Sequence, residues 1–595
     1  MFLINAQNIS KSYGVIPLFK DISFNISEGE RLGLIGPNGC GKSTFLKILM
    51  GLETPDNGKI VKSRNVHTVY LAQTDVFNSY DTVQTVLFEN KANLLGQADC
   101  QYLIREVTFS DSVFNLDQKI SSLSGGWRKR IAIIKALLQK PTVLLMDEPT
   151  NHLDLEGILW LEEILNKTNC AYVLVSHDRY LLENCTNVIM ELNRVYIDGY
   201  LKNSGNYSDF LQKREQILSG QIQQEQVLLN KMRREQEWLQ RQPKARTTKA
   251  QYRIDNAEKL RENLRLLKTS NLQNRKAGIN FDATGRKTKI LISLNQVALT
   301  REHKKLFSNL SLKLTPGFCL GLMGPNGSGK SSLINLLKGD LLPAQGVIER
   351  ADNLRIINFD QHRQQLNQQQ TLWHALAPDS DSVTFRGQNI HVAAWAKRFL
   401  FAVDQLHQSV SRLSGGEQAR VLIANLMLQP ADILLLDEPT NDLDIATLEI
   451  LEDSLSDFPG AIVLITHDRY LIDRLSDQLL YLDGDGHAEF FADYAQWRQS
   501  LQSRGQSSIT SSPEKIAKTK KLTYEEQKEL QRLPDKIQKA EAAVAALQAQ
   551  LSEPHIMNDQ TRLLQLCKEI ETANSKVESL YQRWQELEAS NSRSA

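Results

Sequence analysis

Two glycine-rich segments contain the residue types of a loop that binds phosphate. They read GPNGCGKS at 36–43 and GPNGSGKS at 324–331, and each follows an apolar run. In such a loop glycines let backbone N–H groups surround a phosphate, a lysine reaches its outer oxygens, and a serine hydroxyl faces magnesium at a helix N-terminus. The predicted phosphate-binding residues are Gly36, Pro37, Asn38, Gly39, Cys40, Gly41, Lys42, Ser43 and Thr44, and then Gly324, Pro325, Asn326, Gly327, Ser328, Gly329, Lys330, Ser331 and Ser332.

Two Asp-Glu pairs supply the carboxylates that phosphoryl transfer needs. Asp147 and Asp437 end apolar runs, where a carboxylate can hold magnesium through water. Glu148 and Glu438 follow directly and are placed to orient or deprotonate an attacking water. An isolated pair of this kind also occurs as a solvated strand end, but here PTN and LD follow both pairs.

Further polar residues follow other apolar runs. His177 and His467 could hydrogen-bond a terminal phosphate, and Gln73 and Gln361 could complete magnesium or water coordination beside Ser43 and Ser331. A single histidine or glutamine in such a place is more often structural. The predicted magnesium ligands are Ser43, Gln73, Asp147, Ser331, Gln361 and Asp437.

These motifs recur in the same order, which indicates an internal duplication. The glycine-rich loops and the glutamines are 288 residues apart, whereas the LSGG, DEPTN and HDRYL segments are 290 apart. Short apolar runs followed by turns and helical patterns predict an α/β fold with buried parallel strands. We expect one domain at 1–204 and its copy at 290–500.

The segment at 205–289 has a different composition. Sparse apolar residues at helical spacing predict a hairpin of two helices, broken at Gln242 and Pro243, with a first arm about 50 Å long. It holds 19 basic and 9 acidic residues. A solvated helix pair is the ordinary interpretation, but tip cations near Trp238 and Tyr252 favour contact with RNA phosphates and bases. The candidate nucleic-acid residues are Arg241, Lys244, Arg246, Lys249 and Arg253.

The C-terminal part predicts a tether and then a coiled coil. The stretch at 501–522 is rich in Ser and Gln and predicts a flexible tether. Apolar residues spaced by three and four on both sides of Pro554 predict an antiparallel coiled coil at 523–590. Residues 513–595 carry 13 basic and 13 acidic residues, so a stabilising or protein-binding role and nucleic-acid binding are both open from the residues alone.

The combined motifs resemble the nucleotide-binding domain of ATP-binding cassette proteins. The resemblance implies two P-loop cassettes meeting head to tail, with ATP and Mg²⁺ between the phosphate loop of one and the LSGG of the other. ATP at the first loop would contact Ser414, Gly415 and Gly416, and ATP at the second loop would contact Ser124, Gly125 and Gly126. It also implies that Tyr13 stacks on adenine; the corresponding residue in the second copy is Arg301.

Tandem cassettes joined by a basic hairpin resemble the ABC-F subfamily, and the C-terminal coiled coil resembles its Uup group. This implies an ATPase that acts on the ribosome and tRNA as a translation factor, with a monomer pairing its own cassettes. The alternative is an ATPase that binds DNA structures in replication, recombination or repair through the coiled coil. The ATPase subunit of a transporter is a third interpretation, which leaves the basic hairpin unexplained.

Composition restricts the class of protein. The 595 residues carry a net charge of +1, and no run approaches the roughly 18 apolar residues of a membrane span. The six scattered cysteines and the start of the sequence predict a cytoplasmic protein without a secretory signal. The near-neutral total conceals +10 in residues 205–289 and therefore −9 elsewhere.

Overall fold

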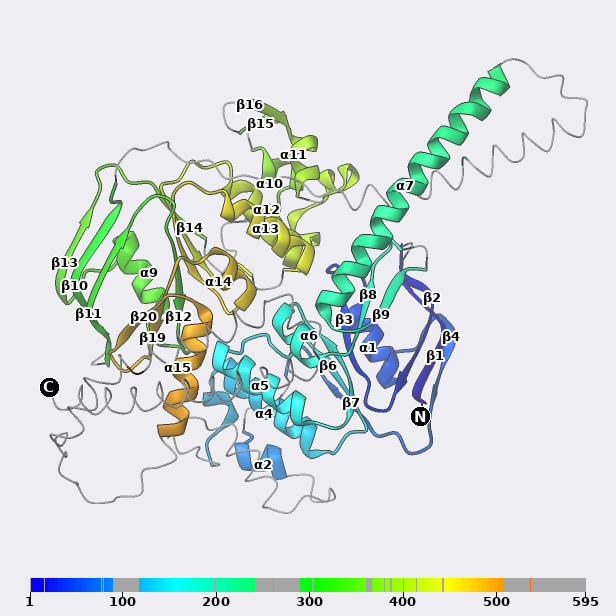
Figure 1. Cartoon of the computed structure of the whole chain (residues 1–595), viewed down its shortest axis with the longest axis horizontal. Helices are drawn as coiled ribbons and strands as arrows, with labels where there is room; N and C mark the ends of the chain where they lie inside the picture. Colours follow the sequence, from blue (N-terminus) through cyan, green and yellow to red (C-terminus); the bar gives the residue numbers. More distant parts are fainter. Residues whose placement is uncertain are drawn as a thin grey trace, which may run out of the picture. The chain divides into compact units, whose positions relative to one another are not determined.

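The structure is a computed structural model of the chain. It describes residues 2–507 except 15, 76, 79, 89–116, 197, 241–260, 262–288, 302–303, 360–365, 379, 386–387, 400, 414 and 441–442, together with residue 536. Figure 1 shows the two cassettes, which repeat the same order of elements.

Each cassette begins with a three-stranded antiparallel sheet. In the first cassette the strands are β1 (Phe2–Tyr13), β2 (Ile16–Ser27) and β4 (Asn57–Lys62), in the order β2-β1-β4. In the second they are β10 (Ile292–Arg301), β11 (Lys304–Leu314) and β13 (Gln345–Arg350), in the order β11-β10-β13. Buried residues recur along β1, and the register shifts of its pairing with β2 interrupt a strict alternation.

A six-stranded sheet forms the centre of each cassette. The first has the order β5-β6-β7-β3-β8-β9 and contains β3 (Arg31–Ile35), β5 (Thr68–Leu71), β6 (Val143–Asp147), β7 (Ala171–Val175), β8 (Val188–Leu192) and β9 (Tyr200–Ser204). The second has the order β14-β17-β18-β12-β19-β20 and contains β12 (Cys319–Met323), β14 (Ile356–Phe359), β17 (Ile433–Asp437), β18 (Ala461–Ile465), β19 (Gln478–Leu482) and β20 (Ala488–Phe491). All pairings are parallel except those of the last strand, so the predicted α/β class is confirmed.

Helices pack against both faces of these sheets. The first cassette has α1 (Lys42–Met50), α2 (Val83–Phe88), η1 (Ile120–Ser122), α4 (Gly125–Leu138), α5 (Leu155–Lys167) and α6 (Arg179–Cys185). The second has α9 (Lys330–Lys338), α10 (Leu372–Leu376), α11 (Val392–Arg398), η2 (Val403–His407), η3 (Val410–Arg412), α12 (Gly415–Leu426), α13 (Ile445–Ser456) and α14 (Arg469–Leu475), with a hairpin of β15 (Ser382–Phe385) and β16 (Gln388–His391). Because parallel strands end at one edge, the loops that follow them meet there.

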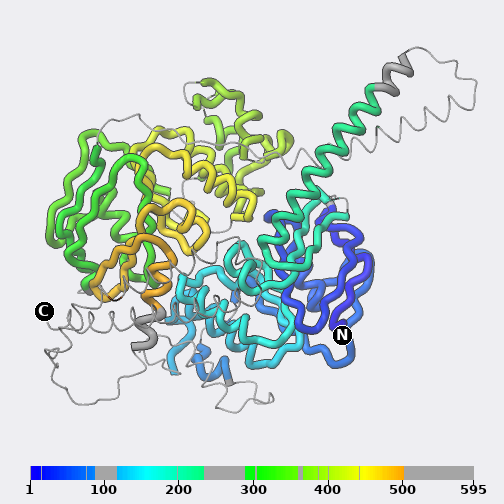
Figure 2. The backbone as a smooth tube through the Cα atoms, in the orientation of Figure 1, coloured from blue at the N-terminus to red at the C-terminus, as the bar shows by residue number. Residues whose placement is uncertain are grey.

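Helix α7 (Tyr207–Gln240) begins directly after β9, which it contacts, and its start belongs to the first cassette (Figure 2). Tyr207 and Phe210 are buried in the core formed by α5, β7 and α6. The predicted break at Gln242 and Pro243 lies outside the described residues. Arg241, Lys244, Arg246, Lys249 and Arg253 lie outside the described residues.

The predicted tether at 501–522 is wrong for its first residues. Helix α15 (Tyr494–Ser507) continues through them. Its first turns are fixed by Trp497, which is 1% exposed, and Leu501 packs against the same cluster. Glutamine, serine and arginine extend a helix once its start is anchored. The rest of the tether lies outside the described residues, as does the coiled coil at 523–590 except residue 536.

In the part of the chain that the structure describes, no helix is both long enough and apolar enough to cross a bilayer.

Candidate functional site

The first phosphate loop folds around its own lysine. Lys42 Nζ donates hydrogen bonds to the carbonyl oxygens of Gly36 at 2.7 Å and Pro37 at 3.2 Å. Gly36 has a φ of 149°, and a Cβ there would lie 2.4 Å from the carbonyl oxygen of Leu192. Only glycine fits this close approach.

The second loop repeats this geometry. Lys330 Nζ donates to the carbonyl oxygens of Gly324 at 2.7 Å and Pro325 at 3.0 Å. Gly324 has a φ of 144°, and its Cβ would lie 2.2 Å from the carbonyl oxygen of Leu482. Both loops are therefore preformed, with a lysine that can turn from carbonyl oxygens to a phosphate.

Serine and aspartate lie together beside each loop. Ser331 Oγ donates to Asp437 Oδ2 at 3.0 Å, and Ser43 hydrogen-bonds Asp147 in the same way. Burial raises the pKa of Asp147, while the bond from Ser43 lowers it. Asp147 Oδ1 is buried and has no hydrogen-bond partner among the described residues. A buried oxygen left without a donor beside a hydroxyl fits a hard cation such as Mg²⁺.

Glu148 is held by three side chains. Its Oε2 accepts from Gln73 Nε2 at 3.2 Å and from Asn151 Nδ2 at 2.7 Å, and its Oε1 lies 3.6 Å from His177 Nε2. Burial raises the pKa of Glu148, but His177, Lys42 and Asn151 outweigh burial and lower it to about 2. The residue has a φ of 48°, a strained conformation of the kind often found at functional sites.

Glu438 has the same strained backbone, with a φ of 49°, and its Oε1 lies 3.1 Å from His467 Nε2. Burial raises the pKa of Glu438 to about 8 against the opposing charge of Lys330. Burial together with Lys330 lowers the pKa of His467 to about 4. Gln361, predicted to complete magnesium or water coordination, lies outside the described residues.

The first loop and the LSGG segment of the second cassette line one cavity of about 440 Å³. We call this cavity site one. Its walls include Tyr13, Asn38, Gly39, Gly41, Lys42, Ser43, Thr44, Gln73, Glu148, Gly415 and Gly416. Tyr13 is 57% exposed at the end of β1, and Lys11 Nζ lies 5.6 Å from its ring centroid. Ser414, which precedes Gly415, lies outside the described residues.

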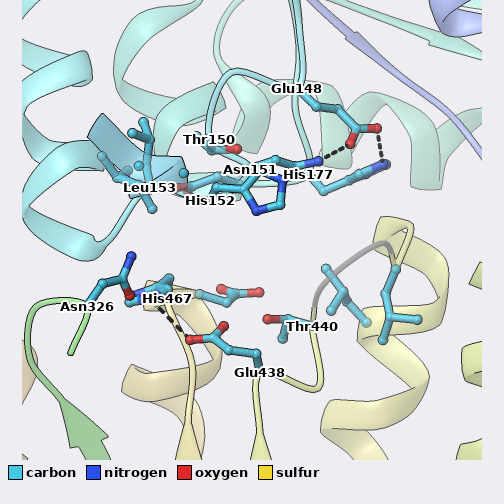
Figure 3. A pocket seen from close by; sticks show the side chains of 17 residues that line it. Glu148, Thr150, Asn151, His152, Leu153, His177, Asn326, Glu438, Thr440 and His467 are labelled. Atoms are coloured by element: carbon cyan, nitrogen blue, oxygen red, sulfur yellow. Dashed lines mark hydrogen bonds and ion pairs between the residues drawn. The ribbon is translucent and has the colours of Figure 1, made fainter. Parts of the chain in front are cut away.

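A second cavity, of about 300 Å³, lies between the cassettes. Figure 3 shows Glu148 and His177 on one side of it and Glu438, His467 and Asn326 on the other. Gly125 and Gly126 also line it, and a Cβ on Gly126 would lie 3.8 Å from Asn326 Nδ2. The LSGG segment of the first cassette therefore faces the second phosphate loop; we call this arrangement site two.

A backbone contact joins the cassettes at site one. The N–H of Asn38, within the phosphate loop, donates to Asp444 Oδ2 at 3.0 Å. Asp444 also caps α13 by accepting from the N–H of Thr447 at 2.9 Å. Burial raises the pKa of Asp444, but its hydrogen bonds with Thr447 and Asn38 bring it below its ordinary value.

Buried arginines that the sequence analysis missed also join the cassettes. Arg179 Nη2 lies 2.8 Å from Glu452 Oε1, and Arg469 Nη1 lies 2.6 Å from Glu162 Oε2. Arg469 Nη2 also donates to both oxygens of Asp178 at 3.2 Å. The arginines and the glutamates are each 290 residues apart, which was the signal that could have found them.

Trp127 and Arg301 are two of the points where the copies differ. Trp127 is partly buried, and the Arg130 guanidinium lies 4.9 Å from its ring centroid while pairing with Asp154 at 2.7 Å. The Trp127 side chain therefore packs against the core of the first cassette and supports Arg130. Arg301 is exposed at the end of β10, in the position that Tyr13 has at the end of β1.

Family models match most of the chain's length in four segments. A model described as ABC transporter matches residues 19–151 and 307–441. Another with the same description matches 199–279, and a model of the ABC transporter C-terminal domain matches 521–589.

Relatives match over nearly the whole chain. ATP-binding protein Uup of Escherichia coli is 30% identical and YfmR of Bacillus subtilis, described as an uncharacterized ABC transporter ATP-binding protein, is 34% identical; each match covers 99% of both chains. The chain belongs to the ABC-F subfamily of ATP-binding cassette proteins. The energy-dependent translational throttle protein EttA of Escherichia coli is 32% identical, over 80% of this ABC-F chain and 91% of EttA.

Solved structures share the fold of this ABC-F protein. RNase-L inhibitor matches with a TM-score of 0.58 and 22% identity, covering 84% of this chain and 93% of that one. The archaeal ribosome recycling factor aABCE1, solved in complex with the stalk protein aP1, matches with a TM-score of 0.57 and 22% identity over 83% and 92%. At this identity the likeness shows the tandem-cassette fold alone.

Proposed function

We propose that this ABC-F protein binds and hydrolyses one Mg²⁺-ATP at site one and another at site two. The observation that carries the proposal is site one itself, where Lys42, Glu148 and Gly416 line a single cavity although they come from two cassettes. Its volume of about 440 Å³ suits a nucleotide-sized ligand. Both halves of each site come from one chain, so a monomer suffices.

The described side chains have different roles in ATP binding and hydrolysis. Lys42 and Lys330 hold phosphate oxygens, and the glycines of the LSGG segments offer N–H groups to the terminal phosphate from the opposite side. Glu148 and Glu438 orient or deprotonate the attacking water, and His177 and His467 contact both the glutamate and the terminal phosphate.

Mg²⁺ fits the oxygen donors of these sites. Among the described residues no group of three or more His, Cys, Asp or Glu side chains could hold a metal by itself. Mg²⁺ is usually bound by one or two protein groups together with the phosphates and water. Ser43 and Asp147, with their counterparts Ser331 and Asp437, would hold it, with Gln73 and Gln361 completing the shell. When bound, the ion neutralises charge that develops on the phosphates.

The partner proposed for this ATPase is the ribosome with tRNA. The segment at 205–289 carries a net charge of +10, as a phosphate-contacting hairpin needs, and α7 anchors it on the first cassette. EttA, a relative at 32% identity, has translation in its name. ATP would favour the closed arrangement of the cassettes and hydrolysis would release it, so the nucleotide controls where the hairpin lies.

A DNA-directed function is the alternative, because local basic residues lie just before the matched C-terminal domain at 521–589 and at its first position. The cluster consists of Lys515, Lys518, Lys520 and Lys521.

The test uses the chain with Glu148→Gln and Glu438→Gln. ATP turnover should be lost while ATP binding is kept, so the protein should remain in the ATP state and sediment with 70S ribosomes in ATP. The matched control, Glu163→Gln with Glu349→Gln, changes two exposed glutamates in the same way and should behave as the unaltered chain. Unchanged pelleting of the double variant would contradict the ribosome proposal. Loss of branched-DNA binding on deletion of 513–595, with ribosome pelleting kept, would support the DNA function.

A further inference from the structure

Lys129 is a buried lysine on α4 to which none of the nucleotide motifs gives a role. Its side chain is 1% exposed. Nζ donates to the carbonyl oxygen of Ala72 at 2.8 Å and to that of Gln73 at 3.1 Å, and it lies 3.4 Å from Asp75 Oδ1. An ammonium has three donors. All three are therefore directed at one loop, the loop that carries Gln73.

This loop supplies a side chain to site one. Gln73 Nε2 donates to Glu148 Oε2 at 3.2 Å. Gln73 itself is exposed, and Lys129 holds its backbone through the bond to its carbonyl oxygen. The position of its amide relative to Glu148 thus depends on where α4 places the lysine.

Helix α4, which carries Lys129, also contributes residues to site two. Gly125 and Gly126, at the start of α4, line the cavity that also contains Asn326 and Glu438. Lys129 follows Gly126 by three residues, about 4.5 Å along the helix axis. A displacement of the LSGG segment at site two is therefore transmitted to the lysine within one rigid turn.

The second cassette has no such connection from this position. The corresponding residue of the second cassette is Ala419, 290 positions after Lys129. It is 4% exposed and has no polar side-chain atom. At this position, among the described residues, α12 of the second cassette therefore offers no side-chain donor like that of Lys129.

We propose that Lys129 is a positioning residue that couples the two nucleotide sites, tying Gln73 of site one to the LSGG segment that serves site two. When nucleotide at site two draws in Gly125 and Gly126, α4 carries the Gln73 loop into register with Glu148. This inference rests on the proposed ATPase function. Coupling is reciprocal for binding free energies but not for kcat, so nucleotide at site one also favours binding at site two, while the effect on kcat falls on site one.

The substitution Lys129→Met keeps most of the side-chain volume and removes the three donors. The effects of Lys129→Met on the two sites are measured separately in chains in which only one site hydrolyses ATP. With Glu438→Gln all turnover comes from site one, and with Glu148→Gln all turnover comes from site two. We expect Lys129→Met to lower kcat at site one roughly tenfold, the size of loss that misplacement of a positioning group produces, with KM changed less than about twofold. At site two the loss should stay within about twofold.

A double-mutant cycle tests the coupling itself. Lys330→Ala empties site two, and it should lower site-one turnover when Lys129 is present but add nothing when position 129 is methionine. Lys129→Arg restores a donor to the loop and should recover part of the lost kcat. Lys135→Met makes the same change on the same helix, away from the Gln73 loop, and should leave turnover unchanged.

Equal losses at the two sites, or additive effects of Lys129→Met and Lys330→Ala, would overturn the coupling role. A lower melting temperature together with equal losses of kcat at both sites would show that Lys129 only stabilises the fold. That result would also overturn the coupling role. If the chain with Lys129 intact hydrolyses no ATP in either background, the ATPase proposal fails, an outcome distinct from failure of the coupling.

Discussion

Arg179 reaches from the first cassette to Glu452 of the second, and both side chains are buried where they meet at 2.8 Å. Arg179 is two residues after His177, so the ion pair fixes the histidine loop of one cassette against a helix of the other. Arg469 and Glu162 form the reciprocal pair. The two cassettes are therefore aligned by buried ion pairs whose arginines lie two residues after His177 and His467, and not by the nucleotide sites alone.

Replacing Arg179 by alanine should lower the free energy of unfolding by about 3 kcal/mol, because it leaves a buried carboxylate short of a partner. Arg474 provides the control: it contacts the same Glu452 at 2.9 Å but is 40% exposed. Arg474→Ala should cost below about 1 kcal/mol. Urea unfolding of the full chain measures both, and similar losses would argue against a special role for the buried pair.

Gly126→Ala should impair site two. A Cβ at this position would lie 2.8 Å from the carbonyl oxygen of His152, a backbone atom, so either the LSGG segment or the loop after Glu148 must shift. With Glu148→Gln to silence site one, turnover should fall about tenfold or more. Gly220, a helical glycine with open space around it, is the control, and Gly220→Ala should have no effect on ATP turnover. Normal turnover of Gly126→Ala would show that the segment tolerates the displacement.

Tyr13→Ala should weaken nucleotide binding at site one, since stacking of a base on an aromatic ring contributes about 1 to 3 kcal/mol. In a Lys330→Ala background, titration with a fluorescent ATP analogue should show an increase in Kd of about tenfold. Tyr80 is 87% exposed and does not line the cavity, so Tyr80→Ala should leave Kd unchanged. An unaltered Kd for Tyr13→Ala would place the adenine elsewhere.

Phe210→Ala should destabilise the first cassette by about 3 to 5 kcal/mol, because the ring is fully buried and its removal leaves a cavity. Leu211 is the adjacent residue and is 36% exposed, so Leu211→Ala should cost less than about 1 kcal/mol. Thermal unfolding followed by circular dichroism compares them. Equal, small losses would mean that α7 is not anchored in the cassette core.

The spacing of motifs could predict which side chains gather at site one. Gln73 and Glu148 both follow parallel strands, β5 and β6, and such strands end at the same edge of a sheet, so the sequence alone places them together. The LSGG glycines of the second cassette could be placed at site one only through the resemblance to cassette proteins. No local sequence pattern indicates that they face the phosphate loop of the other cassette.

The side chains that connect the sites could not be predicted in the same way. The contacts of Lys129 depend on how α4 packs beside β5, and Arg179 meets Glu452 across 273 residues of chain. Each left a weak signal nevertheless. Lys129 lies between Gly126 and Ile133 on the buried face of its helix, where a lysine is unusual unless it is paired.

Helix α7 is long and anchored at its start, so a small rotation there produces a large displacement of its far end. Its 34 residues span roughly 50 Å, and its start is held by Tyr207 and Phe210 against the core that includes α6, the helix that begins with Arg179. A rotation of about 5° at this pivot would move the far end by roughly 4 Å, more than the length of a hydrogen bond. For the proposed ribosome partner, a small rotation at the cassette interface would thereby be enlarged into a displacement that makes or breaks contact between the hairpin and an RNA phosphate backbone.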